Sequence, residues 1–228
     1  MKKNNRKKYK SPFSGAIENY SAACATERDS ISFCTGLCSI ASNSGYGAST
    51  LAHQVCSAAV CTGDRSMAIS KDCWSAAINT GRDSKAKALC PYSVAACITQ
   101  RSEAIANGFK SIAANTGDYG ASRADGNAGV AVSTGHSGEA IATGSGSVAI
   151  ATGDNGLLKG LKGSVLIWVK YSNYNTIDNV IVRTVDGEAI KENTYYKIVD
   201  NDVVEVDENQ KYGFPIDDRL ARIFNFQH

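Results

Sequence analysis

The sequence predicts an all-β fold, in which a parallel β-solenoid of the flattened β-roll kind is followed by a small β-rich domain. The first observation is a nine-residue repeat over Gly108–Gly153, where glycine opens each nonamer. The second is a pair of columns of small residues: with that glycine as position 1, position 6 is Ala, Ser or Thr and position 4 is Ser, Ala or Gly from Ser21 to Ala149. A fixed period of this kind is typical of stacked repeats.

A longer period of eighteen residues is the third observation. In alternate repeats position 5 is apolar throughout, and we call the corresponding surface the apolar face: Ala22, Ile40, Ala58, Ala76, Val94, Ile112, Val130 and Val148. In the interleaved repeats position 5 is of mixed character, and we call that surface the mixed face: Ile31, Ser49, Met67, Lys85, Glu103, Ala121 and Glu139. Each nonamer predicts a short strand and a tight turn, so one coil holds two nonamers. From Glu27 to Gly153 this gives seven coils, a rod about 34 Å long at ~4.8 Å per strand.

The charges of the mixed face decide which positions point inward there. Lys85, Glu103 and Lys87 occupy positions 5 and 7 and cannot lie unpaired in a dry core. Because side chains alternate along a strand, positions 4, 6 and 8 must point inward and form a thin core of small residues. The apolar face has two possible registers, with its Ile and Val side chains either exposed or in the core. Either register leaves one smooth, uncharged face, which is an interface or a binding plane.

Composition divides the chain into a basic tail (1–16), the solenoid (17–156) and a β-rich capping or attachment domain (157–228). The basic run Met1–Lys10 is interpreted as a solvated tail rather than a nucleic-acid contact, and Ser11–Glu18 as a cap on the open end. Beyond the repeats we expect a hinge or cap at Leu157–Gly163, a strand at Ser164–Tyr171 and a polar turn at Asn173–Asn179. A second strand at Val180–Val185, a hairpin at Tyr195–Val206 and a helix at Asp217–Phe226 are expected to follow.

Aromatic and cysteine residues are interpreted mainly as structural. Trp74 falls in a turn and is expected at the surface. The rings of the last domain are expected in its core and rim, with sugar binding as the alternative: Trp168, Tyr171, Tyr174, Tyr195 and Tyr196. Cysteines are expected mostly as small buried thiols, although Cys38 and Cys56, one coil apart, have a spacing that permits a disulfide.

No chemical motif stands out. The turns lack the aspartate ladder of calcium-binding nonapeptides, no phosphate-binding loop is present, and neither His53 nor His136 has a nucleophile partner, so we expect no cofactor, metal or catalytic residue. No apolar run is long enough to cross a membrane and no export signal is found, which predicts synthesis in the cytoplasm without membrane insertion.

The segments GEAIATG (Gly138–Gly144) and GSVAIATG (Gly146–Gly153) resemble the head repeats of YadA-like trimeric autotransporter adhesins, which have the form SVAIG-x-x-S-x-A-x-G. This resemblance implies a left-handed β-roll assembled as a homotrimer. The coil of eighteen residues is longer than in that family, and the export signal and membrane anchor are missing. Val185–Lys197 (VDGEAIKENTYYK) also resembles a segment of uncharacterised nonapeptide-repeat proteins of gut bacteria and their phages.

These observations favour a non-enzymatic structural or interaction protein: a homo-oligomeric, trimeric rod that serves as a virion fibre, decoration protein or adhesin-like shaft, with virion or cell-surface partners. The expected oligomer interface comprises Ile40, Val60, Ile78, Val94, Ile112, Val130, Val132, Val148 and Ile150. One alternative is a plane that binds ice or another lattice through the threonine column at position 9. Another is a carbohydrate-binding C-terminal domain. An enzyme would need a pocket with two convergent carboxylates or with His53.

Overall fold

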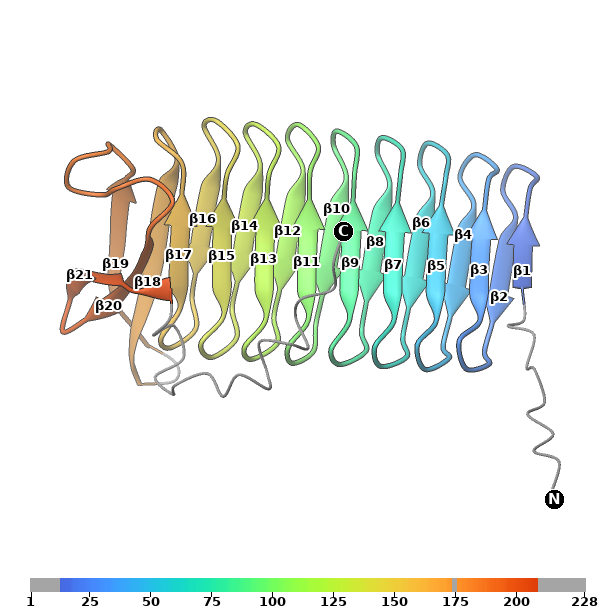
Figure 1. Cartoon of the computed structure of the whole chain (residues 1–228), viewed down its shortest axis with the longest axis horizontal. Coiled ribbons are helices and arrows are strands. Elements are labelled where there is room, and N and C mark those ends of the chain that lie inside the picture. The colour runs from blue at the N-terminus through green and yellow to red at the C-terminus, as the bar shows by residue number, and fades with distance from the viewer. Residues whose placement is uncertain (1–12, 174–175, 209–228) are drawn as a thin grey trace, which may run out of the picture.

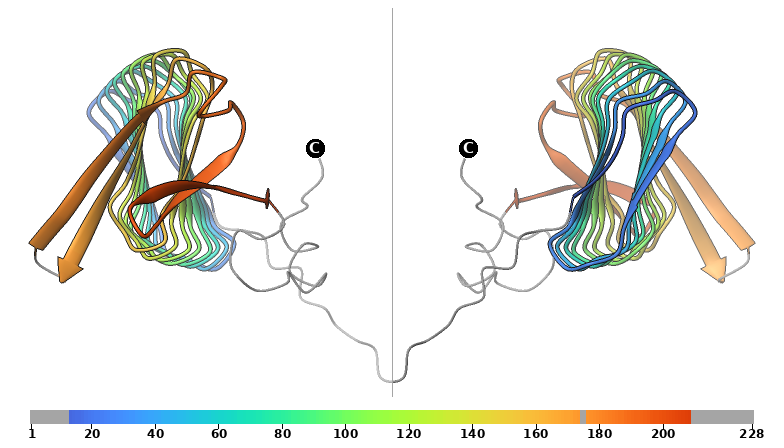
Figure 2. Two further views of the ribbon diagram at one scale, coloured as in Figure 1. Left: turned by 90° about the vertical axis from the view of Figure 1, so that its left-hand side faces the viewer. Right: turned by 90° about the vertical axis from the view of Figure 1, so that its right-hand side faces the viewer.

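The computed structural model describes residues 13–173 and 176–208, and every regular element in these ranges is a β-strand. The strands stack into two sheets that form the long walls of a rod (Figure 1), and the end views show a flattened coil with turns along both edges (Figure 2). The mixed face is the outer surface of an 11-stranded sheet, in the order β1 (Phe13–Ala16), β3 (Ile31–Cys34), β5 (Ser49–Ala52), β7 (Met67–Ser70), β9 (Lys85–Ala88), β11 (Glu103–Ala106), β13 (Ala121–Ala124), β15 (Glu139–Ala142), β17 (Leu157–Gly160), β20 (Tyr195–Val199) and β21 (Asp202–Val206).

The apolar face is the outer surface of a 10-stranded sheet, which contains β2 (Ala22–Ala25), β4 (Ile40–Asn43), β6 (Ala58–Cys61), β8 (Ala76–Asn79), β10 (Val94–Cys97), β12 (Ile112–Asn115), β14 (Val130–Ser133), β16 (Val148–Ala151), β18 (Val165–Asn173) and β19 (Thr176–Thr184). Neighbouring repeat strands pair in parallel with an offset of eighteen residues, as in Ile112 with Val130. The β-solenoid and its coil length are therefore confirmed. Stacking extends from β1 to β18, about nine turns, because strands outside the clear repeat also join the two sheets.

Both sheets have the same register. Positions 6 and 8 are buried in nearly every repeat, while positions 5 and 7 point outward, as in β14, where Ala131 and Ser133 are buried and Val130 and Val132 are partly exposed. The question that the sequence left open is thus decided in favour of outward Ile and Val side chains. The core between the sheets consists mainly of alanine, with Cys34, Cys61 and Cys97 among its members.

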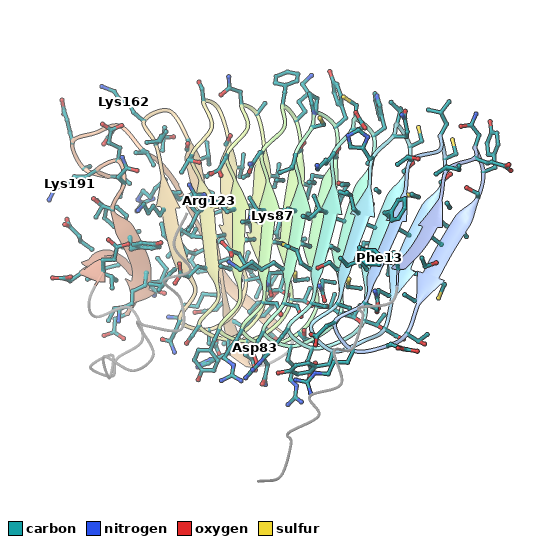
Figure 3. All side chains as sticks on the ribbon, turned by 45° about the vertical axis from the view of Figure 1, so that its right-hand side comes forward. Phe13, Asp83, Lys87, Arg123, Lys162 and Lys191 are labelled. Atoms are coloured by element: carbon teal, nitrogen blue, oxygen red, sulfur yellow. The ribbon has the colours of Figure 1, made fainter. Side chains whose placement is uncertain are left out.

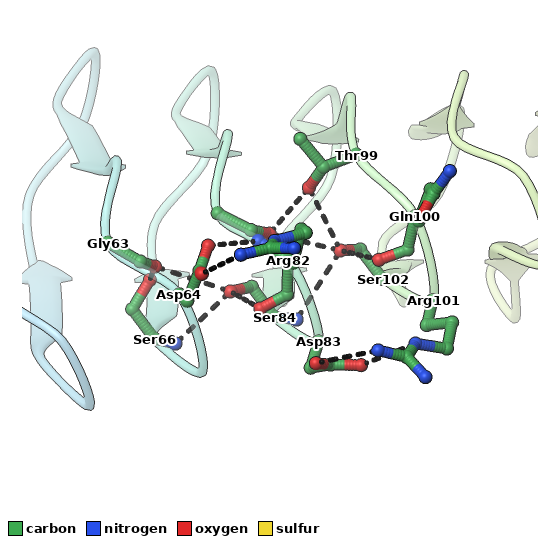
Figure 4. A network of polar contacts seen from close by, with 11 residues as sticks. Gly63, Asp64, Ser66, Arg82, Asp83, Ser84, Thr99, Gln100, Arg101 and Ser102 are labelled. Atoms are coloured by element: carbon green, nitrogen blue, oxygen red, sulfur yellow. Dashed lines mark hydrogen bonds and ion pairs between the residues drawn. The ribbon is translucent and has the colours of Figure 1, made fainter.

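The serine column at position 4 binds the backbone of neighbouring coils. The hydroxyl of Ser102 accepts a hydrogen bond from the backbone N–H of Ser84 (3.3 Å) and donates to the carbonyl of Gly81 (3.1 Å) (Figure 4). Similar bonds recur at Ser57, Ser84, Ser93, Ser111 and Ser147. Buried backbone groups need such partners, because each one left unpaired is costly. The serine column therefore supplies hydrogen-bond partners to the backbone N–H and C=O groups of the turns in neighbouring coils.

The turns explain the glycine period. Position 3 has a left-handed backbone in successive turns, and most of these residues are not glycine, for example Trp74 (φ 60°) and Tyr119 (φ 55°). Glycine is favoured at position 1 for a different reason. A Cβ atom on Gly81 would overlap the carbonyl oxygen of Gly63 in the preceding coil. Close approach of stacked backbones, rather than a left-handed conformation, thus selects glycine there.

The C-terminal part continues the sheets before it closes them. The prediction of a hinge or cap at Leu157–Gly163 is wrong for its first four residues, because β17 pairs in register with β15. The strand predicted at Ser164–Tyr171 is confirmed as β18, which pairs with β16 and then with β19 in an antiparallel hairpin. This hairpin projects beyond the outline of the coil (Figure 2). The predicted polar turn is shorter than expected, since β19 begins at Thr176.

The hairpin predicted over Tyr195–Val206 is confirmed as β20 and β21, and β20 pairs antiparallel with β17. Tyr195, Tyr196 and Trp168 are buried there, as predicted for the core of this region. Residues 13–16 of the expected tail form β1, paired with β3, instead of a separate cap. Tyr174, the basic run and the helix predicted at Asp217–Phe226 lie outside the described residues. No helix within the described ranges is long and apolar enough to cross a membrane.

Candidate interaction surface

The apolar face presents two outward columns from its repeat strands that continue onto β18 and β19. The column at position 5 ends with Val148, Val165 and Thr184, and the column at position 7 ends with Ile150, Ile167 and Val182. All nine residues of the expected interface lie in these two columns. Ile112 is 42% exposed, Ile40 49% and Val182 50%. Within the described strands β2 to β19, neither column contains a charged residue.

A third column, at position 9, borders the same face: Thr26, Ser44, Thr62, Thr80, Ile98, Thr116, Thr134 and Thr152. These residues follow the ends of the apolar-face strands, and most of them are exposed. Their backbone N–H groups bond to the preceding coil, as Thr134 does to Asn115 O (3.0 Å). The face is therefore an uncharged surface three columns wide, with threonine along one side.

The mixed face changes character along the rod. Its first strands carry apolar outward residues such as Ile31, Phe33 and Leu51, whereas Lys85 and Glu103 pair further along at 2.7 Å (Nζ to Oε2). In Figure 3 the labelled Lys87 and Arg123 lie over the sheets, with Asp83 on the lower edge and Lys162 on the upper edge. Charge on this face is thus concentrated in the later coils.

The two edges of the rod differ strongly. The edge that precedes the mixed-face strands is charged, with ion pairs between successive coils, namely Asp64 with Arg82 (3.1 Å) and Asp83 with Arg101 (2.9 Å) (Figure 4). The backbone N–H of Arg82 and then its guanidinium lower the pKa of the Asp64 carboxyl. These charges are balanced by neighbours in the same column, so the edge presents no single-sign patch there.

The opposite edge, which precedes the apolar-face strands, carries a line of exposed aromatic and aliphatic side chains that we call the ridge: Tyr20, Leu37, Val55, Trp74, Tyr92 and Phe109. Trp74, as predicted, is at the surface and is 63% exposed. Its ring stacks on Tyr92 (centroids 4.6 Å apart, 9° between planes), and Tyr92 meets Phe109 edge-on at 5.9 Å. Sequence reasoning found only Trp74. The other ridge residues could have been found from positions 2 and 3 of the repeat, which tend to alternate between apolar and charged residues from one turn to the next.

A hollow of about 560 Å³ is lined by Tyr171 and Ser172 of β18 and by the turns that carry His136 and Asp154. It contains one carboxylate and not His53, so it does not meet the condition set for an enzyme site. No group of three His, Cys, Asp or Glu residues in the described part of the chain is placed to hold a metal. Trp168, Tyr195 and Tyr196 are buried and offer no open ring to a sugar, whereas Tyr171 is 36% exposed.

All eight thiols are free, so the disulfide that the spacing of Cys38 and Cys56 permits is not formed. The expectation of buried thiols is correct for Cys34, Cys61 and Cys97 but wrong for Cys24, Cys38 and Cys56, which are exposed; Cys73 and Cys90 are intermediate. Exposure follows from position, because the buried thiols occupy inward strand positions. Burial raises the pKa of Cys97 to about 12.

Comparisons with known protein families, curated proteins and solved structures find no match for this chain.

Proposed function

We propose that this protein is a non-enzymatic structural rod that assembles with copies of itself, as a homotrimer, through the apolar face. The observation that carries the proposal is the pair of uncharged outward columns, in which residues such as Ile40 and Ile112 keep nearly half of their surface in water. Large contiguous apolar patches on soluble proteins usually mark interaction sites.

The size of the face fits one interface. Ten stacked strands at ~4.8 Å spacing and the width of three columns give roughly 600–900 Å². A stable interface buries about 800 Å² on each partner, so the whole length of the rod is needed for one contact. In-register stacking keeps the columns straight over that length, and a second copy is a rod of the same length and straightness. Self-association alongside the rod is thus favoured over contact with a small partner.

The mass of the assembly in solution tests the proposal. Light scattering after gel filtration at micromolar concentration should give three times the chain mass of 24.1 kDa. Val132→Lys puts a charge on the apolar face and should yield monomers. Ile105→Lys is its matched control, because Ile105 occupies the same outward position 7 on the mixed face and is similarly half-buried. A wild-type monomer under these conditions would refute the proposal.

As a trimer the rod would serve as a virion fibre, a decoration protein or an adhesin-like shaft, with other virion or cell-surface components as its partners. The stiffness of stacked coils and the likeness of the repeats to adhesin heads support this role. Electron microscopy of the assembled protein should show straight particles about 40 Å or more in length, as nine coils at ~4.8 Å require. Bent or globular particles would contradict a shaft.

A second candidate function uses the same surface differently. The threonine column lies outward beside the columns of Ile and Val, in register from coil to coil, which is the arrangement that an ice- or lattice-binding plane needs. A monomer that shows thermal hysteresis, with the effect lost in Thr116→Lys, would support this function over self-assembly. Absence of thermal hysteresis in the wild-type protein would eliminate it.

A further inference from the structure

We infer that in the assembled protein the ridge of each chain packs against the apolar face of the next chain. This inference rests on the proposed homo-oligomer and specifies how its subunits meet. A closed ring of three requires heterologous contacts, in which each chain uses two different patches, whereas a contact of one face with the same face on another chain closes as a dimer. The chain has the apolar face as one patch. The ridge is the second, on the edge beside it.

The ridge has the properties of an unfilled half of an interface. Trp74 is 63% exposed, Leu37 and Phe109 are each 42% exposed, and Tyr92 is 40% exposed. Aromatic residues are the side chains most enriched at the centres of interfaces. All of them stand on turns held by backbone bonds to the next coil, such as Trp74 N to Pro91 O (3.3 Å), so their positions are fixed before any partner arrives.

Side-chain size along the rod connects the ridge with the face. In every coil whose turn carries a ridge residue, at least one outward strand position on the apolar face is small. The pairs, with the ridge residue first, are Tyr20 and Ala22, Leu37 and Ser42, Val55 and Ala58, Trp74 and Ala76, Tyr92 and Ala96, and Phe109 and Ala114.

Where the turns become small, both outward positions become large. The turns at Asn127–Ala128 and Ser145–Gly146 precede strands with Val130 and Val132, and with Val148 and Ile150. If chains stand side by side at the same height, the ridge of one coil meets the face of the corresponding coil. A bulky ridge residue then meets a coil with at least one small outward residue, and a small turn meets a coil with two large ones, which evens out the separation between chains. Close-packed interfaces require this complementarity.

Ring geometry argues against a sugar chain as the occupant of the ridge. A saccharide stacks on an open ring face, but the faces of Trp74 and Tyr92 cover each other at 4.6 Å. The ridge as a whole is a line of exposed aromatic and aliphatic side chains. Such a surface fits an apolar wall, and the apolar face supplies one.

A matched pair of substitutions tests whether the ridge is part of the contact. Trp74 and Tyr119 are both exposed aromatic residues at position 3 of a turn, with φ of 60° and 55°, but they lie on opposite edges. Trp74→Ala should raise the dissociation constant of the assembly at least tenfold in analytical ultracentrifugation. Tyr119→Ala should leave it within twofold. Equal effects of the two substitutions would overturn the inference.

Cross-linking of mixed chains tests what the ridge touches. In full-length protein with Cys24, Cys38, Cys56, Cys73 and Cys90 replaced by serine, one variant carries Lys110→Cys beside the ridge and a second carries Ala114→Cys on the face. Each variant must form an assembly with the same number of chains as the wild-type protein, as measured by light scattering. After the two variants are refolded together and oxidised with copper phenanthroline, a covalent dimer that joins a Lys110→Cys chain to an Ala114→Cys chain through the two introduced thiols is expected. Neither variant oxidised alone should give a covalent dimer.

The outcomes separate this inference from the proposed function. A covalent dimer from the Ala114→Cys chain alone would show face against face, which overturns the ridge contact and the trimer while leaving self-association through the apolar face intact. A wild-type monomer would refute both, and it would be detected by mass before any cross-linking.

Discussion

Asn79 offers the sharpest test of how the coils are held together. Its side chain is fully buried in the core, at the last residue of β8, which is position 8 of the nine-residue repeat. Its Oδ1 accepts a hydrogen bond from the N–H of Gly81 (2.9 Å), and its Nδ2 donates to the carbonyl of Ser66 across the coil (3.1 Å). Asn43 and Asn115 repeat the arrangement two coils away on either side.

The cost of Asn79→Ala follows from what is left behind. The Ser66 carbonyl keeps a bond from the N–H of Lys85 (3.0 Å), so it remains paired. The Gly81 N–H loses its side-chain acceptor inside a buried turn, which costs about 1–3 kcal/mol. The missing amide leaves a void that adds about 1 kcal/mol. We therefore expect a loss of roughly 2–4 kcal/mol in the free energy of unfolding.

Urea unfolding followed by circular dichroism measures this loss, at a fixed protein concentration because assembly contributes to stability. Asn107→Ala is the control: Asn107 is exposed at position 9 on the mixed face, and a change of less than about 0.5 kcal/mol is expected there. Asn79→Cys separates bonding from filling, since Cys61 and Cys97 occupy the same position in the adjacent coils. It should restore volume but retain the cost of the lost acceptor. If Asn79→Ala costs no more than Asn107→Ala, the reasoning is wrong.

Three further predictions concern the turn backbone, the thiols and the charged edge. Ala128→Gly should raise the free energy of unfolding by about 0.5–1 kcal/mol, because Ala128 has a φ of 53°, where glycine is less strained. Cys97, with a pKa of about 12, should resist iodoacetamide at pH 8 in the folded protein, whereas Cys38 should react within minutes, as peptide mass spectrometry can show. The pKa of the Asp64 carboxyl is lowered in the folded protein, so its ionised form adds to the free energy of unfolding at pH values above its ordinary pKa. This contribution is lost as the pH falls through the lowered pKa, so Asp64→Asn should make the free energy of unfolding depend less on pH in that range.

Each of these three has an internal comparison. Ala131→Gly, at an inward strand position in the same repeat, should destabilise, and a gain there would undermine the argument from φ. Cys97 should become as reactive as Cys38 in urea; continued protection would point to a chemical cause other than burial. Asp29 lies on the same charged edge but does not accept the two bonds from Arg82 that Asp64 accepts, so Asp29→Asn should change acid unfolding less than Asp64→Asn.

The sequence predicted the solenoid well because its period reflects stacking directly. A residue and its counterpart eighteen positions later must occupy the same place, so Ala113 and Ala131 reveal the pairing without any knowledge of the fold. The register of the apolar face was undetermined because Ile and Val fit a core as well as an interface. Continuation of the sheets into β17 was missed for a related reason. Leu158 interrupts the small-residue column at position 6, yet the backbone pairing there is unchanged.

Functional surfaces were only partly predictable. Alternation along a strand predicts that positions 5 and 7 lie on one side of the sheet, and the structure shows that this is the outer side for all nine residues expected at an interface. The ridge depends on which turn residues share an edge, and this requires knowing that odd and even turns lie on opposite sides of the rod (Figure 2). Stacking of Trp74 on Tyr92 then follows from their separation of eighteen residues. The molecule that binds such a surface produces no comparable periodic pattern in the sequence of one chain.

Core composition gives a physical reason for association. In the repeats the largest fully buried side chains are Asn79, Asn115 and Thr50, while Ile and Val point outward; Leu157, Leu158 and Leu166 are buried only near the C-terminal end. Alanine burial contributes little hydrophobic free energy for each ordered residue, since the contribution scales with apolar area. A single solenoid therefore depends on backbone bonds and on its serine and asparagine columns. Covering the outer Ile and Val side chains is the remaining large source of apolar burial, which supports the proposed association through the apolar face.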